Sequence, residues 1–169
     1  TRGLGCGMDA NLGMNAALED KEKIRNLFQG QDLSILIASL GGGTGSGAAP
    51  VFAEISQQAK SLTIGIFTLP FSFEGEQRKK VAQNALEKLK DRVDSLLVIS
   101  NDKLLKIIDE KTTVSNAFLI CDDILREAVQ SITDLILVPG IINIDFASVL
   151  SILKNSGQAL FGAGKASGE

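Results

Sequence analysis

Three short apolar segments stand out along the chain, each bounded by polar or glycine-rich sequence. They are residues 33–40 (LSILIASL), 63–69 (TIGIFTL) and 95–100 (SLLVIS), all rich in isoleucine, leucine or valine. Runs of this length that are apolar at nearly every position are typical of strands buried on both faces, as in parallel sheets. The pattern therefore predicts three central strands of one parallel sheet.

Between and after these segments the apolar residues recur every three or four positions, which indicates helices. The pattern covers residues 48–59, 76–90 and, over some six turns, 113–138, where Pro139 ends it. Strands that alternate with helices indicate right-handed crossovers and an α/β fold. The longest helix is expected to cross the core. A short helix at 146–154 and a strand at 159–161 are predicted after it.

The composition is that of an ordinary globular domain. Of 169 residues, 44% are hydrophobic and 22% are charged, and the net charge is −3. No apolar run approaches the roughly 18 residues that span a bilayer, and no basic stripe is present. We therefore expect no direct binding to membranes or nucleic acid. With no histidine, and with Cys6 and Cys121 far apart in sequence, we also expect no metal site and two reduced thiols, as in a cytoplasmic protein.

A glycine-rich segment, residues 41–47 (GGGTGSG), lies between the first predicted strand and the helix after it. Without Cβ atoms, successive backbone N–H groups can approach an anion closely, and the start of a helix adds positive potential. The hydroxyl groups of Thr44 and Ser46 could add donors. We predict that this segment binds the phosphate groups of a nucleotide; a flexible linker is the alternative.

The glycine-rich segment alone does not specify which nucleotide it would bind. The Gly-Lys-Ser/Thr of a Walker loop is missing, whereas Gly43-x-Gly45-x-x-Ala48 matches the looser dinucleotide fingerprint. That fingerprint expects an acid about 20 residues on, after the next strand, and the first acid there is Glu74. A nicotinamide-dependent oxidoreductase thus stays an alternative without its confirming residue. A second cluster, Gly3 to Gly7, suggests another wall of the same phosphate site.

Five motifs in order resemble landmarks of FtsZ, within the tubulin and FtsZ superfamily of polymerising GTPases. They are GGGTGSGAAP at Gly41, TRGLGCG at Thr1, PFSFEGEQR at Pro70, NDKLL at Asn101 and NIDFASV at Asn143. The resemblance covers essentially the whole chain.

The resemblance implies two regions. Residues 1–139 would be a Rossmann-like GTP-binding domain without its N-terminal strands. Residues 140–169 would hold the catalytic loop, the following helix and the first strand of a C-terminal domain. The chain begins without a methionine and stops without a closing element, so we expect a segment of a longer protein. Because a sheet without its opening strands exposes apolar edges, the isolated segment should be unstable or aggregate.

The resemblance also implies a site for GTP or GDP, with Mg²⁺ on the phosphates. Glu74 and Arg78 would lie by the ribose and α-phosphate, and Asn101 would contact the sugar or base. Phe118 would stack on guanine and Asp123 would accept its N1 and N2 hydrogens, unless Asp123 is a solvated acid on the far helical face. The glycine-rich residues of the phosphate and ribose side would be Gly3, Gly5, Gly7, Gly41, Gly42, Gly43, Thr44, Gly45, Ser46 and Gly47.

Two positions depart from the family pattern. Asp122 stands where an asparagine usually precedes the guanine-binding acid. In addition, FtsZ proteins usually insert two acids, three residues apart, into the site of the neighbouring subunit, and here these positions hold Asp145 and Ser148. Carboxylates can orient and polarise a water towards the γ-phosphate, whereas serine is a poor base. Asp145 is the predicted catalytic residue, and it could also cap the following helix.

The function that the resemblance implies is GTP hydrolysis at subunit interfaces of a head-to-tail homopolymer. Such a protein would be cytoplasmic and form the division ring at the septum, with adaptor proteins bound through a C-terminal tail outside this segment. An alternative is a filament scaffold that binds GTP but hydrolyses it slowly because of Ser148.

Overall fold

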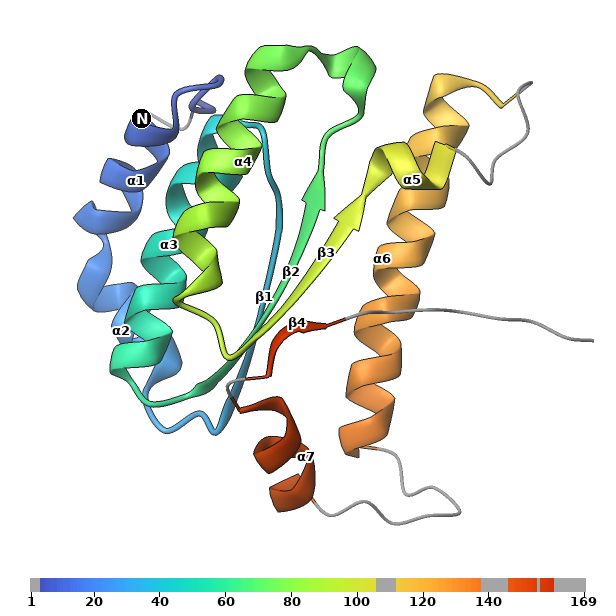
Figure 1. The fold of residues 1–169 in the computed structure, drawn as a ribbon. Helices are drawn as coiled ribbons and strands as arrows, with labels where there is room; N and C mark the ends of the chain where they lie inside the picture. The colour runs from blue at the N-terminus through green and yellow to red at the C-terminus, as the bar shows by residue number, and fades with distance from the viewer. Residues whose placement is uncertain (1–3, 106–111, 138–145, 155, 160–169) are drawn as a thin grey trace, which may run out of the picture.

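The computed structural model describes residues 4–105, 112–137, 146–154 and 156–159. Within these residues, four parallel strands form one sheet in the order β1-β2-β3-β4 (Figure 1). Their bounds are Leu33–Ser39, Leu62–Leu69, Ser95–Ser100 and Gly157–Ala159. The three predicted central strands and the parallel α/β class are therefore confirmed. The strand predicted at 159–161 overlaps β4 at one residue, and the rest of it lies outside the described residues.

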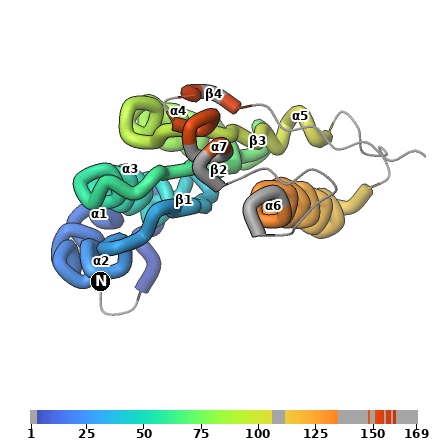
Figure 2. Tube along the Cα trace, turned by 90° about the horizontal axis from the view of Figure 1, so that it is seen from below, coloured from blue at the N-terminus to red at the C-terminus, as the bar shows by residue number. Residues whose placement is uncertain are grey.

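Helices cover both faces of the sheet. α3 (Gly43–Gln58) and α4 (Glu76–Lys90) lie on one face and α6 (Val114–Leu137) lies on the other (Figure 2). Phe67 and Leu96 pack towards the first pair, and Ile66 and Leu97 pack towards α6. β2 is buried on both faces at nearly every position, as its apolar sequence predicts.

Two helices precede the sheet in the chain. α1 (Ala10–Glu19) and α2 (Lys21–Phe28) pack on α3 rather than on the strands. Phe28 and Ile24 of α2 contact Val51 and Ile55, which belong to the predicted apolar face of α3. α3 is therefore buried on two sides, between the sheet and the first two helices.

Three short elements lie at the two ends of the sheet. The 3₁₀ helix η1 (Ser72–Glu74) and α5 (Asn101–Leu105) follow the carboxyl ends of β2 and β3, whereas α7 (Phe146–Leu153) lies near the amino ends (Figure 1). In the described part of the chain, no helix is long and apolar enough to cross a membrane.

Candidate functional site

The glycine-rich segment is mostly helix. Only Gly41 and Gly42 form the turn after β1, and α3 begins at Gly43 rather than at the predicted residue 48. Gly41 has a φ of 105°, a conformation that favours glycine. The low helix propensity of glycine led to the late predicted start, and tertiary packing overrides it.

The glycines inside α3 allow other backbone segments to approach it closely. A Cβ atom at Gly43 would lie 2.7 Å from the carbonyl oxygen of Asp9. One at Gly47 would overlap the carbonyl oxygen of Ala10 and lie 2.6 Å from the nitrogen of Met14. A Cβ atom at Gly45 would likewise overlap the carbonyl oxygen of Ser39. These glycines therefore bring α1 and the end of β1 against the first turns of α3.

The two glycine clusters are joined by a backbone hydrogen bond. The N–H of Gly43 donates to the carbonyl oxygen of Gly7 (2.7 Å), and the N–H of Gly41 donates to Ser46 Oγ (2.8 Å). Three further backbone N–H groups at the start of α3 have no acceptor among the described residues. They belong to Gly42, Thr44 and Gly45. Three free N–H groups at a helix start form a ready anion site. Gly3 lies outside the described residues.

A cavity of about 230 Å³ opens beside this helix start, at the carboxyl edge of the sheet. Five of the predicted nucleotide-binding residues line it: Gly42, Glu74, Arg78, Asn101 and Phe118. Asn101 is only 7% exposed, and its Oδ1 is a buried acceptor without a partner in the described residues. Because an unpaired buried polar atom is costly, this oxygen marks Asn101 as a candidate ligand contact.

Replacing Asn101 with leucine tests this interpretation. Without nucleotide the melting temperature should stay within a few degrees of the wild-type value, because Oδ1 makes no hydrogen bond to lose. The rise in melting temperature on adding GDP should shrink, because the ligand loses a partner. Differential scanning calorimetry with and without GDP measures both. An unchanged response to GDP would remove Asn101 from the site.

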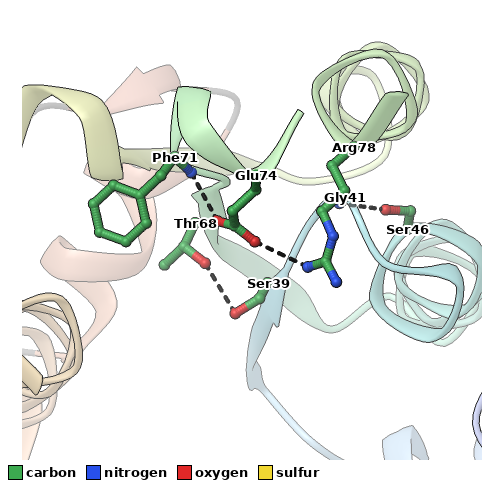
Figure 3. A network of polar contacts seen from close by, with 7 residues as sticks. All are labelled: Ser39, Gly41, Ser46, Thr68, Phe71, Glu74 and Arg78. Carbon is green, nitrogen blue, oxygen red and sulfur yellow. Dashed lines mark hydrogen bonds and ion pairs between the residues drawn. The ribbon is translucent and has the colours of Figure 1, made fainter. Parts of the chain in front are cut away.

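A polar network frames one side of the cavity (Figure 3). Glu74 accepts from the N–H of Phe71 at 2.8 Å and forms an ion pair with Arg78 at 2.9 Å. The Glu74 side chain is 16% exposed, whereas Arg78 is 45% exposed. Below them, the hydroxyl of Thr68 donates to Ser39 Oγ. The predicted acidic and basic residues are therefore preassembled, and Arg78 retains exposed donors for an anion.

An aromatic group covers the opposite side, beside α6. The ring of Phe118 stands edge-on to that of Phe71, with centroids 5.1 Å apart and an interplanar angle of 88°, and Phe71 stacks on Phe73. Phe118 is 40% exposed, which leaves ring surface for a planar base. The stacking role of Phe118 stays a prediction.

The acids of α6 are placed differently from the prediction. Asp123 forms an ion pair with Arg126 (3.5 Å) and does not line the cavity, whereas Asp122 does. Cys121 also lines it, and burial, followed by the charges of Asp122 and Glu74, raises the pKa of its thiol. The thiol is therefore neutral near pH 7. Helical spacing from Phe118, by three and four residues, could have identified both residues.

A larger cavity, about 500 Å³, lies at the amino edge of the sheet beside α7. Exposed charged and polar side chains line much of it, among them Asp32, Lys60 and Lys154. It has no free helix start and is remote from the glycine turn. The smaller cavity is therefore the candidate nucleotide site. The predicted catalytic Asp145 lies outside the described residues, and Ser148 is exposed on α7.

Proteins of known structure share this fold. Residues 1–109 match the model of the Tubulin/FtsZ family, GTPase domain. FtsZ from M. jannaschii, solved as an empty dimer, is 43% identical over 94% of this chain, with a TM-score of 0.90. CetZ1 from Haloferax volcanii, a GDP-bound monomer, is 27% identical over 93% of the chain, with a TM-score of 0.73.

CetZ2 from Haloferax volcanii, solved as a GTPγS-bound protofilament, is 26% identical over 91% of the chain, with a TM-score of 0.72. The chain spans 46% of the length of each of these three relatives. The match to a GTPase domain implies a guanine nucleotide and disfavours the dinucleotide alternative. Family model, sequence identity and fold agree, and the chain belongs to the Tubulin/FtsZ family.

Proposed function

We propose that this chain is the guanine-nucleotide-binding part of a GTPase that assembles head to tail. The observation that carries the proposal is the free helix start at Gly42, Thr44 and Gly45, next to a cavity lined by Asn101, whose buried Oδ1 has no partner among the described residues. The N–H groups would hold phosphate oxygens and Arg78 would add positive charge. Mg²⁺ would be bound through the phosphates and neutralise their charge during hydrolysis.

The two ends of the fold support a composite active site. The nucleotide cavity lies at the carboxyl edge of the sheet, whereas α7 lies at the amino edge (Figure 1). Asp145 directly precedes α7 in the sequence. In a head-to-tail polymer, Asp145 of one subunit would meet the nucleotide of the next and orient the attacking water.

The relatives support self-assembly, because one was solved as a dimer and another as a protofilament. We extend the proposal to a cytoplasmic division-ring filament, with a nucleotide domain at residues 1–139 and the start of a second domain at 140–169. Adaptor proteins would bind a C-terminal tail, and no direct membrane or nucleic-acid contact is proposed.

Phosphate release at increasing protein concentration tests the proposal. A composite site requires turnover per subunit to rise cooperatively with concentration. Turnover that is independent of concentration would contradict assembly at the active site. A second candidate, a slowly hydrolysing GTP-binding scaffold, is favoured by the serine at position 148.

Replacing Ser148 with aspartate decides between these two. The change supplies the second carboxylate of the family pattern, so the hydrolysis rate should rise severalfold while GDP affinity stays constant. Ser151→Asp, on the same exposed helix, is the matched control and should leave the rate unchanged. If Ser148→Asp does not accelerate hydrolysis, the serine does not explain slow turnover.

A further inference from the structure

Ser46 is a buried serine of α3, and its oxygen faces the backbone of the turn after β1. The residue is 3% exposed, and Oγ accepts the N–H of Gly41 at 2.8 Å (Figure 3). A hydroxyl in this position bridges the turn after β1 to the first turn of α3. It therefore ties together both sides of the turn that carries the free N–H groups.

The turn needs such a tie because Gly41 has unusual geometry. Its φ of 105° is open mainly to glycine, the residue with the greatest freedom to leave it. Behind it, the carbonyl oxygen of Arg78 and the ring of Pro70 leave only 3.1 and 3.2 Å to the place of a Cβ atom. Gly41 is buried, so without Ser46 its N–H would have no acceptor.

We propose that Ser46 is a positioning residue for nucleotide binding and acts through Gly41. Its hydroxyl holds the turn so that the N–H groups of Gly42, Thr44 and Gly45 converge before the nucleotide arrives. This differs from a direct hydroxyl contact with phosphate. The inference rests on the proposed function, because it takes the ligand to be a guanine nucleotide.

The experiment compares three variants of the full-length protein. Ser46→Ala removes the acceptor and Ser46→Thr retains it. Ser56→Ala is the matched control, since Ser56 is a fully buried serine on the same helix whose hydroxyl bonds Thr63 (2.8 Å), away from the turn. The two readouts are amide hydrogen exchange at Gly41 without nucleotide, measured by NMR, and the Kd for GDP and GTP, measured by calorimetry.

Ser46→Ala should accelerate exchange at Gly41 at least tenfold and weaken GDP and GTP about equally, by roughly tenfold. Ser46→Thr should restore both. Ser56→Ala should lower the melting temperature without changing either readout. Unchanged exchange at Gly41 in Ser46→Ala, wild-type GDP affinity, or a loss confined to GTP would each overturn the proposal. If the wild-type protein bound no guanine nucleotide, the proposed function would fail, while the exchange readout would still test the bond.

Discussion

Replacing Gly47 with alanine is expected to lower the free energy of unfolding by about 3 kcal/mol, the usual upper range for overpacking. The new Cβ would overlap the carbonyl oxygen of Ala10 and lie 2.6 Å from the nitrogen of Met14, both backbone atoms of α1. Backbone cannot rotate away as a flexible side chain can, so α1 must separate from α3. Urea unfolding followed by circular dichroism measures the change.

Whether Gly47→Ala destabilises or stabilises the protein distinguishes close packing from helix propensity. Alanine is the better helix former by about 1 kcal/mol, so helix propensity alone predicts stabilisation. Gly42→Ala is the control: its φ is −94° and nothing lies within 4 Å of the added Cβ, so only the cost of alanine at a helix N-cap, about 1 kcal/mol, is expected. A Gly47→Ala protein as stable as the wild type would show that the α1–α3 contact is looser than described.

Replacing Asp145 with asparagine should reduce GTP hydrolysis by about a hundredfold or more, because the proposed composite site would lose the carboxylate that activates water. The affinity for GDP should not change, since in the proposed composite site that acid would serve the nucleotide of another subunit. A coupled phosphate-release assay and a calorimetric titration measure the two quantities.

A mixture of two variant proteins is the control for this prediction. Subunits with Asp145→Asn retain an intact nucleotide cavity, and subunits with Asn101→Leu retain Asp145. Where the nucleotide cavity of an Asp145→Asn subunit meets the Asp145 of an Asn101→Leu subunit, the interface would contain both intact halves of the active site. Turnover of the mixture should therefore exceed the sum of the separate variants. A simple sum would contradict the composite site.

The strands were the easiest part of the fold to predict. β2 is buried on both faces, so its sequence is apolar almost throughout, and its end at Leu69 was found correctly. The start of α3 was predicted wrongly because the reason for its glycines lies in α1, some 30 residues earlier in the chain. α2 and α5 were missed since they are short, at Lys21–Phe28 and Asn101–Leu105.

In the candidate site too, local sequence motifs identified some residues, whereas others depend on tertiary packing. The resemblance selected Gly42, Glu74, Arg78, Asn101 and Phe118, and all five line one cavity. It did not select Asp122, because the rotation of α6 about its axis is set by packing of residues such as Ala128 against the sheet. The bond between Ser46 and Gly41 depends on a rotamer, which no sequence pattern specifies.

Calorimetric titration of the full-length protein with GDP in the presence of Mg²⁺ tests the central claim most directly. The claim is that free N–H groups at the start of α3, with Arg78 and Asn101, hold a guanine nucleotide. We predict saturable binding of one GDP per subunit, with ATP and NADH at least a hundredfold weaker, about 2.7 kcal/mol. Absence of binding, or equal binding of ATP, would contradict the account.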